Sequence, residues 1–453
     1  MPKKLVVVLF LLAFIPVVIY FSLAAKYKYK VAQDYQYALN SSVHTEITTQ
    51  LKGGVFSFSS PNQWDTGFIR VRVKAAITGY FAEPFIEILS GSTVSVLSLE
   101  RGVDGERYIN LPTVNTQTPA KIQLIAHHLS IEDQQVSLFL FSNPRVHQQA
   151  KILIISPHPD DAEIAAFGLY SQHNTLIVTL TAGEAGPHRY DDIYPDVQQQ
   201  HQTKGKLRVW DSITVPMLGG VLPERAINLG YFDNTLAQMY VQPNSPVHSL
   251  HSGSSNVNDF RRQNVSKLVP VTNGVATWTA LVSDLKQIIQ NFSPDIIVSP
   301  YPALDWHLDH KLATQAVLDA LQQLNLQQGQ LFLYTNHLSF NNYFPYGAQG
   351  ELAPIPPDFT QSLYFDSLYS FAPTNPQAKI FALDAMHDLR PDTTWLEPSG
   401  AFKLWMKAMS NKFLLRDQSY FRRAVRANEL FLVVNFSSLY QEKVIKRLKG
   451  TEE

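Results

Sequence analysis

Hydrophobic and polar residues follow three different patterns along this chain. Residues 5–25 form a run without a charged side chain. From 43 to 145, short runs rich in β-branched and aromatic residues alternate with turn residues, which predicts a β-sandwich domain. From 149 to 453, fully apolar runs alternate with helically spaced ones, and this order predicts an α/β domain with a parallel sheet and a C-terminal extension.

The charge-free run is long enough to cross a membrane. As a helix, its 21 residues would span about 31 Å, close to the thickness of a bilayer core. A cleaved signal peptide is the alternative, because Ser22 and Ala24 are small residues at a suitable cleavage position. A signal-peptide core has only about 7–15 residues, so we predict residues 1–30 to be a transmembrane anchor.

Lysines flank this run on both sides and leave its orientation nearly balanced. Lys3 and Lys4 precede it, while three further lysines follow it within the next five residues. We expect the N-terminus inside the cell and the catalytic region outside the cytoplasm, in a periplasmic position. The cytoplasmic face stays open as the alternative.

Six short runs in the predicted sandwich have the composition of strands. They span 54–59, 68–73, 86–89, 93–97, 121–125 and 136–141. Residues 68–73 (FIRVRV) alternate apolar with charged positions, the pattern of a half-buried strand. No catalytic cluster is visible here. Trp64 is either an exposed aromatic for sugar binding or a structural core residue.

The α/β region alternates predicted strands with predicted helices. The strands are Lys151–Ser156, 175–181, 295–299 and Gln330–Tyr334. The helices are 162–172, 277–292 and 312–324, followed by helical runs at 402–409 and 421–430. Part of the polar stretch between the second and third strands is expected to form a loop over an active site. In sheets of this kind, ligands bind beyond the carboxyl ends of the strands.

The amino-acid composition excludes several kinds of partner and active site. The 453 residues carry a net charge of -1, which argues against a nucleic-acid partner. The chain has no Cys, so a thiol nucleophile, an iron–sulfur cluster and Cys-ligated zinc are excluded. Any metal site must use His, Asp or Glu.

Two motifs crowd imidazoles and carboxylates after predicted strands. The first is SPHPDDAE at 156–163, and the second is DWHLDH at 305–310. Either one alone could be a polar turn that caps a helix, since Asp suits that position. Because both occur at the end of a buried strand, together they indicate one catalytic site.

The residue types in these motifs suit a catalytic zinc ion. Such an ion takes three protein ligands and keeps one position for water, whose pKa it lowers to about 7. A carboxylate beside the metal can take the proton from this water, and a second His can face the developing oxyanion. Of the adjacent Asp160 and Asp161, one can bind the metal while the other faces the water. Asp309 is placed to orient an imidazole.

The strand followed by PHPDDAE, then TLTAGEAG and the later DWHLDH, resembles the PIG-L/LmbE family of zinc-dependent N-deacetylases. The resemblance covers about 151–334. It implies a Rossmann-like α/β fold and removal of the acetyl group from N-acetylglucosamine-type substrates. The zinc ligands that it implies are His158, Asp161 and His310. It also implies Asp160 as the general base, His307 as the group that stabilises the oxyanion, and Asp309 as the residue that tunes His307.

Three further residues are candidates for substrate binding. The segment 206–211 (KLRVWD) is similar to a family Arg-x-x-Glu segment, with Arg208 retained and Asp211 in place of the Glu. The segment 228–234 is similar to a Leu-Gly-x-x-Asp segment, so Asp233 is expected to line the substrate pocket. Glu184 and Arg208 are candidate sugar contacts. The alternative for all three is an ordinary loop residue or a surface ion pair.

These observations predict a membrane-anchored, zinc-dependent hydrolase that removes N-acetyl groups from GlcNAc-containing glycans or glycolipids. Its expected partners are the glycan or glycolipid substrate and the membrane, with no nucleic acid. Two alternatives stay open. One is a zinc amidase that acts on another acylated amine, and the other is a glycan-binding scaffold with a degenerate site. The sequence leaves the oligomeric state open.

Overall fold

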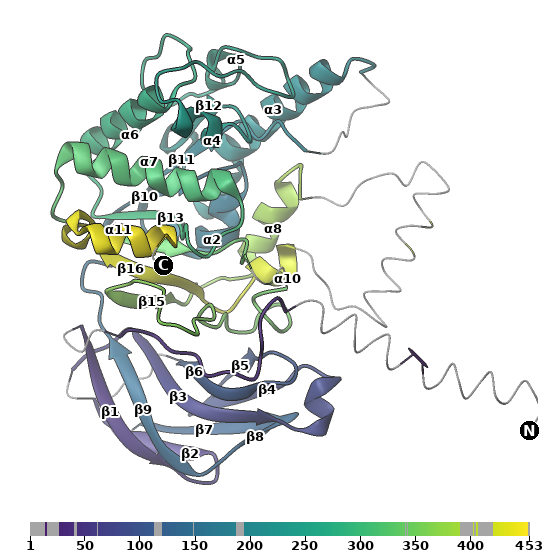
Figure 1. Ribbon diagram of the computed structural model, residues 1–453, viewed down its shortest axis with the longest axis vertical. Coiled ribbons are helices and arrows are strands. Elements are labelled where there is room, and N and C mark those ends of the chain that lie inside the picture. Colours follow the sequence, from purple (N-terminus) through teal and green to yellow (C-terminus); the bar gives the residue numbers. More distant parts are fainter. Residues whose placement is uncertain are drawn as a thin grey trace, which may run out of the picture.

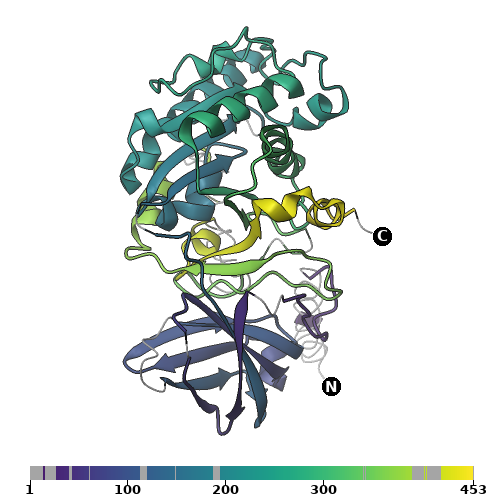
Figure 2. The same ribbon diagram turned by 90° about the vertical axis from the view of Figure 1, so that its left-hand side faces the viewer.

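A computed structural model describes most of the chain. The described residues are 14–15, 27–39, 43–60, 62–112, 120–147, 149–186, 194–339, 341, 343–389, 402, 405 and 420–451. Two antiparallel sheets lie at one end of the molecule and a sheet covered by helices lies at the other (Figure 1). The same order is visible after a quarter turn (Figure 2).

The first part contains two antiparallel sheets. One has the order β1-β9-β3-β6, with β8 paired to β3, and the other has the order β2-β7-β4-β5. The strands of the first sheet are β1 (His44–Leu51), β3 (Thr66–Ala75), β6 (Asp104–Leu111), β8 (Leu129–Ile131) and β9 (Gln134–Phe141). Those of the second are β2 (Val55–Phe58), β4 (Phe85–Ser90), β5 (Thr93–Ser98) and β7 (Ala120–His127).

The two sheets share one hydrophobic core. In β3, Val71 and Val73 are buried while Arg72 between them is exposed, as the alternating sequence requires. Val71 and Val73 share this core with Ile86 and Ile88 of the opposite sheet. Trp64 is 8% exposed and belongs to the same core, so of its two alternatives the structure favours the core residue. The domain boundaries at 43 and 145 stay a prediction.

The second part is built on a seven-stranded sheet with the order β12-β11-β10-β13-β14-β16-β15. Its strands are β10 (Lys151–Ser156), β11 (Asn174–Thr181), β12 (Ala226–Tyr231), β13 (Ile296–Pro300), β14 (Gln330–Tyr334), β15 (Ser367–Phe371) and β16 (Glu429–Asn435). The first five strands in this order are parallel, whereas β16 and β15 extend the sheet by antiparallel pairing. The fold is therefore mixed α/β with several sheets, as predicted in outline.

Helices cover both faces of this sheet. They are α2 (Asp161–Tyr170), α3 (Val197–Thr214), α4 (Leu236–Val241), α5 (Asn258–Arg261), α6 (Trp278–Phe292), α7 (Leu308–Leu324), α8 (Ala378–Ala385), α10 (Tyr420–Ala424) and α11 (Glu442–Lys449). In β10, Leu153 and Ile155 belong to the core formed with α6 and α7. Ile152 and Ile154 belong to the core formed with α2 and α8. Helices on both sides of the sheet thus explain why four successive residues of this strand, 152–155, are apolar.

Most predicted elements of this part are found within one or two residues of their expected ends. The helix predicted at 421–430 is wrong, because it ends at Ala424 and Glu429 begins strand β16. The run ELFLVVN is apolar on both faces since it lies inside the sheet, between β14 and β15. The stretch expected as a loop over the site contains α3, β12, α4 and α5. The helix expected at 402–409 lies outside the described residues, apart from Phe402 and Trp405.

The predicted membrane anchor and the localisation that follows from it are corrected. Within the described part of the chain, no helix has both the length and the apolar character needed to cross a bilayer. The segment 5–25 lies outside the described residues, apart from Phe14 and Ile15.

Candidate active site

The two motifs meet at the carboxyl ends of β10 and β13. SPHPDDAE forms the turn from β10 into α2, and DWHLDH leads from β13 into α7. Ser156 Oγ fixes this turn by donating to the carbonyl oxygen of His158 at 2.6 Å and accepting from the amide of Ala162 at 3.2 Å. Asp160 has a φ of 155°, in a region that is costly for a residue with a side chain. Such strain at a polar turn is typical of functional sites.

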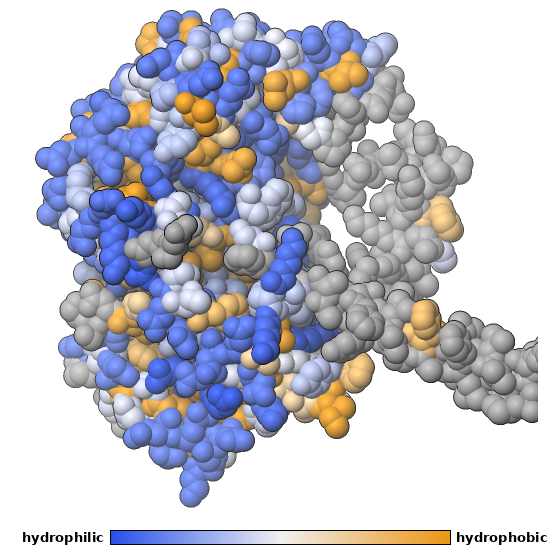
Figure 3. All heavy atoms as spheres, viewed as in Figure 1, coloured by the Kyte–Doolittle hydropathy of each residue, from blue (hydrophilic) through white to orange (hydrophobic). Residues whose placement is uncertain are grey.

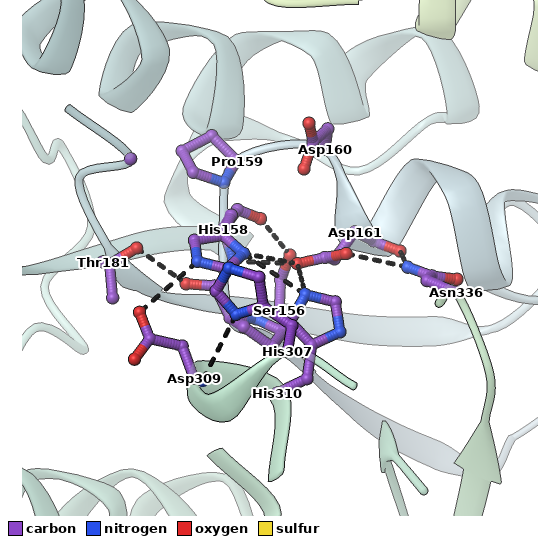
Figure 4. Close-up of polar contacts among 12 residues, drawn as sticks. Ser156, His158, Pro159, Asp160, Asp161, Thr181, His307, Asp309, His310 and Asn336 are labelled. Carbon is purple, nitrogen blue, oxygen red and sulfur yellow. Dashed lines mark hydrogen bonds and ion pairs between the residues drawn. The ribbon is translucent and has the colours of Figure 1, made fainter. Parts of the chain in front are cut away.

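Three side-chain atoms converge on one point (Figure 4). Oδ2 of Asp161 lies 3.3 Å from Nδ1 of His158 and 3.2 Å from Nε2 of His310. The two imidazole nitrogens are 3.3 Å apart. A regular tetrahedron whose corners lie about 2.0 Å from its centre has edges of about 3.3 Å. The three predicted ligands therefore have the mutual spacing that a tetrahedral metal site requires.

Carboxylates behind the two imidazoles turn them towards this point. Nδ1 of His310 donates to Oδ2 of Asp305 at 2.9 Å. Nε2 of His158 lies 3.1 Å from Oδ1 of Asp233 and 3.5 Å from Oδ2 of Asp309. Each imidazole thus directs its other nitrogen to the shared point, as metal-binding histidines do.

The carboxylates around the two imidazoles also raise the pKa values of His158 and His310. Burial alone would lower the pKa of His158, but the carboxylates of Asp233, Asp161 and Asp309 raise it well above its usual range. Burial likewise opposes protonation of His310, yet Asp161 and Asp305 raise its pKa to about 10. The site therefore favours a positive charge, and a metal cation can supply it.

Asp161 itself is held by two donors. The backbone amide of His158 donates to its Oδ2 at 2.9 Å, and Nδ2 of Asn336 donates to its Oδ1 at 2.8 Å. Although burial raises the pKa of Asp161, His310 and His158 lower it well below its usual range. Asp161 is thus an ionised carboxylate, the form that binds a metal.

Other side chains close to this point could share a metal. The groups with suitable spacing include His158, His307 and His310, and also Asp161, His310 and His337. His337 follows the end of β14, and its ring centroid lies 4.9 Å from that of His310. Burial and the neighbouring His310 lower the pKa of His337 to about 4, so its ring is neutral and can donate a lone pair.

Asp160 lies beside these atoms and is tied to Arg208. Nη2 of Arg208 donates to Oδ2 of Asp160 at 3.0 Å and to the carbonyl oxygen of Pro159 at 3.1 Å. Burial raises the pKa of Asp160 to about 7, although Arg208 opposes this rise. A carboxylate with a pKa near neutrality can both accept and release a proton.

His307 caps α7 and faces the same space. Its Nδ1 accepts from the backbone amide of Asp309 at 3.3 Å, so the neutral ring carries its proton on Nε2. Burial and the rings of His158 and His310 lower the pKa of His307. A neutral His307 remains able to donate a hydrogen bond through Nε2.

These side chains line an open cleft with a volume of about 340 Å³. Among the predicted residues, the cleft is lined by His158, Asp160, Asp161, Arg208, Asp233 and His307. Trp306 stands at this cleft and is 52% exposed. The cleft is thus open to a substrate at one side and carries the candidate metal ligands at the other.

Comparison with known families gives one match. Residues 153–321 match the family described as PIG-L, GlcNAc-PI de-N-acetylase. Residues 153–321 are a PIG-L family domain. No curated protein matches the chain.

Solved structures add little to this assignment. The hydratase GalB from Pseudomonas putida KT2440 is 12% identical, with 62% of this chain and 95% of that chain covered, at a TM-score of 0.32. A family two carbohydrate esterase from Cellvibrio japonicus is 11% identical, with 78% and 100% covered, at a TM-score of 0.16. Both TM-scores are too low to support an argument about fold or activity.

Within the PIG-L domain, two predicted residues have surroundings that the sequence did not indicate. The carboxylate of Asp309 lies 3.5 Å from Nε2 of His158, its backbone amide donates to His307, and its negative charge raises the pKa of His307 against the effect of burial. Glu184 is fully buried and does not line the cleft. Its carboxylate accepts from the amide of Asp233 at 3.1 Å and from Oγ of Ser249 at 2.7 Å. Glu184 therefore positions Asp233 from behind.

Several residues of the site were not singled out from the sequence. Asp305 belongs to the second motif, and its place five residues before His310 was the available signal. Asn336 lies just beyond the carboxyl end of β14. Because ligands bind at this edge of a parallel sheet, its position after a predicted strand was the available signal. Asp388 lies outside both motifs, and its Oδ2 is 3.3 Å from Nη1 of Arg208 and 3.2 Å from Nζ of Lys204. No sequence pattern pointed to Asp388.

Proposed function

We propose that this protein is a zinc-dependent hydrolase that removes N-acetyl groups from GlcNAc-containing glycans or glycolipids. The observation that carries the proposal is the triangle of His158 Nδ1, Asp161 Oδ2 and His310 Nε2, with edges of 3.2 to 3.3 Å. The PIG-L family domain supports a GlcNAc-type de-N-acetylase activity.

The donor set suits zinc. Two neutral imidazoles and one carboxylate leave a fourth position free in a tetrahedral site, which is the arrangement of catalytic zinc. When bound, zinc would lower the pKa of a water molecule and polarise the acetamide carbonyl. Asp305, Asp233 and Asn336 hold the three ligand side chains in place.

The chain's own residues carry the proton transfers. Asp160 accepts the proton of the attacking water, and Arg208 keeps its carboxylate in place. His307 donates a hydrogen bond through Nε2 to the oxyanion that forms on the acetamide carbon. The C–N bond then breaks, the proton that Asp160 took from the water passes to the leaving amine, and acetate and a free amine are released.

Acetate release tests this proposal. The full chain, loaded with zinc, is incubated with GlcNAc and with N-acetylated chitooligosaccharides, before and after treatment with a chelator. We expect acetate and amine in equal amounts, loss of activity on chelation, and recovery with zinc. The control variant is Asp104→Asn, which alters a surface ion pair of the sandwich and should keep full activity. Zinc-bound protein that releases no acetate from any of these sugars would contradict the proposal.

A further inference from the structure

A segment from outside the PIG-L domain reaches the wall of the catalytic cleft. The family match ends at residue 321, whereas His387 and Asp388 follow α8, and Asp388 lines the cleft together with Arg208. The 3-10 helix η2 (Val215–Gly219), which directly continues α3, packs against α8. The region of α3 and the segment after α8 are therefore neighbours in space, although they lie far apart in the sequence.

One face of α3 holds this segment. Lys204, Arg208 and Asp211 follow one another at helical spacing, so their side chains project from the same side of the helix. Asp211 accepts from the backbone amide of His387 at 2.9 Å, and its Oδ1 lies 2.6 Å from Nδ1 of the same residue. Oδ2 of Asp388 lies 3.2 Å from Nζ of Lys204 and 3.3 Å from Nη1 of Arg208. Three side chains of α3 thus fix two successive residues of the segment.

The ion pairs of Asp388 are shielded from water. The face of the molecule shown in Figure 3 is mainly hydrophilic, with hydrophobic residues only in small groups. Ion pairs at such a surface contribute little, because water screens them. The side chains of Lys204, Arg208 and Asp388 are by contrast only 4%, 7% and 18% exposed. Removing one member of a buried pair is costly, because the other charge stays behind without compensation.

The guanidinium group of Arg208 joins two carboxylates. Its Nη1 faces Asp388, and its Nη2 donates to Oδ2 of Asp160 at 3.0 Å. A planar guanidinium holds its donors in a fixed fork, so a shift of one nitrogen also shifts the other. Burial opposes the charge of Arg208, but Asp160 and Asp388 raise the pKa of its guanidinium above the usual range. Asp388 therefore supports the contact between Arg208 and Asp160.

Backbone groups make the position of this guanidinium exact. Nη1 of Arg208 also donates to the carbonyl oxygen of Gly183 at 2.8 Å, and Nη2 donates to that of Pro159 at 3.1 Å. Gly183 has a φ of 65°, and a side-chain carbon at this position would lie 2.4 Å from Nη1. Because the space is this narrow, a small displacement of Arg208 breaks several of its contacts at once.

Asp388 also separates two cations. Nζ of Lys204 and Nη1 of Arg208 both lie within 3.3 Å of the same carboxylate oxygen, Oδ2 of Asp388. Burial lowers the pKa of Lys204, Asp388 raises it, and the charge of Arg208 lowers it again. Without Asp388 the ammonium and the guanidinium would face each other across a short gap. Their repulsion would then move the guanidinium from its position.

We propose that Asp388 is a positioning residue, which balances the charge of Lys204 and holds Arg208 in the place from which Arg208 directs Asp160. This inference rests on the proposed function, in which Asp160 accepts the proton of the attacking water. It adds that a residue outside the PIG-L domain is required for full activity.

Steady-state kinetics of Asp388→Ala test the proposal. We expect kcat for acetate release from chitooligosaccharides to fall about 10- to 100-fold, since a reacting group that is misplaced by about 1 Å can cost this much. KM should change little, and zinc should stay bound at one equivalent. Asp388→Asn keeps the size of the side chain and should lose less activity; it carries the same comparison if Asp388→Ala does not fold. Glu224→Ala, at an exposed position outside the cleft, is the control and should keep the parental kcat.

A double-mutant cycle tests whether Asp388 acts through Arg208. Arg208→Lys keeps a positive charge but cannot bridge two carboxylates as a planar fork does. In this background, Asp388→Ala should lower kcat much less than it does in the parent. An equal loss in both backgrounds would overturn the positioning role. A raised KM with unchanged kcat would overturn it too, and would indicate a direct contact between Asp388 and the sugar.

A crystal structure of zinc-loaded Asp388→Ala, or of Asp388→Asn, reports the position of Arg208 without any measurement of activity. We expect the guanidinium to have left hydrogen-bond distance of Asp160. An unmoved guanidinium would overturn this inference. Acetate release by the parent with an undiminished kcat in Asp388→Ala would overturn this inference alone. A parent that releases no acetate, with Arg208 displaced in the variant, would overturn the proposed reaction alone.

Discussion

Oδ2 of Asp305 accepts a hydrogen bond from Nδ1 of His310 at 2.9 Å, and both side chains are fully buried. The carboxylate fixes the ring so that Nε2 faces Asp161 and His158. Asp305 touches neither the cleft nor the shared point itself, so it acts through His310.

Replacing Asp305 is therefore expected to weaken metal binding. Partners of this kind contribute about 10- to 100-fold to metal affinity, and we expect a loss of this size in Asp305→Ala. Competition with a chromophoric chelator measures it. Asp305→Asn, which retains an acceptor, should lose less. Equal zinc affinity in Asp305→Ala and the parent would show that Asp305 does not orient a ligand.

The variant Asp160→Asn distinguishes the role of general base from the role of metal ligand. The variant keeps the size of the side chain and removes its ability to accept the proton. We expect zinc to remain bound at one equivalent while kcat falls by about 10²- to 10⁴-fold. Metal analysis and acetate release on the same sample check this. Undiminished turnover would exclude Asp160 as the base.

Trp306 offers an indole face at the rim of the cleft, next to His307. The apolar C–H face of a sugar ring can pack on such a surface, so we expect Trp306→Ala to raise KM for chitooligosaccharides by about three- to ten-fold with kcat little changed. Trp210 is 50% exposed on α3, outside the cleft, and Trp210→Ala is the matched control. An unchanged KM in Trp306→Ala would contradict a contact between Trp306 and the sugar.

The buried carboxyl group of Glu163 is expected to make the stability of the fold depend on pH. Burial raises the pKa of Glu163 from 4.5 to about 8, and its Oε1 accepts from the hydroxyl of Tyr170 at 3.2 Å. Between these two pH values the folded state keeps the proton that the unfolded state has lost. Stability should therefore fall as the pH rises from 4.5 to about 8, by an amount on the order of a few kcal/mol.

Denaturant unfolding of the metal-free chain measures this dependence. Glu163→Gln removes the titrating group, so its stability should vary less over the same pH range. The exposed Glu224 provides the control variant Glu224→Gln, which should follow the parent. Parallel curves for the parent and Glu163→Gln would show that Glu163 is not protonated in the folded state.

The sequence predicts best where periodicity and burial agree. Lys151–Ser156 and Gln330–Tyr334 are apolar in their interiors, and both are strands with the predicted bounds. Strand β6 escaped prediction because it carries charged residues, among them Arg107, which is buried and paired with Glu100 at 3.3 Å. The helix predicted to reach 430 failed because an apolar run alone does not distinguish a buried helix from a strand inside a sheet.

The motifs brought the candidate ligands together, but their surroundings depend on tertiary structure. Asp309 stands two residues from His307, yet its carboxylate faces His158 on another element. Asp388 reaches Arg208 from a segment 180 positions further along the chain, according to their numbers. Contacts of this kind have no periodicity or local spacing that a single sequence could reveal.

The proposed chemistry depends most on one metal position shared by His158, Asp161 and His310. Anomalous diffraction at the zinc edge, from crystals of the zinc-loaded chain, locates the metal directly. We expect one strong peak about 2.0 to 2.2 Å from Nδ1 of His158, Oδ2 of Asp161 and Nε2 of His310. A peak bound by His337 in place of His158, or no peak at these residues, would contradict the ligand set and the reaction built on it.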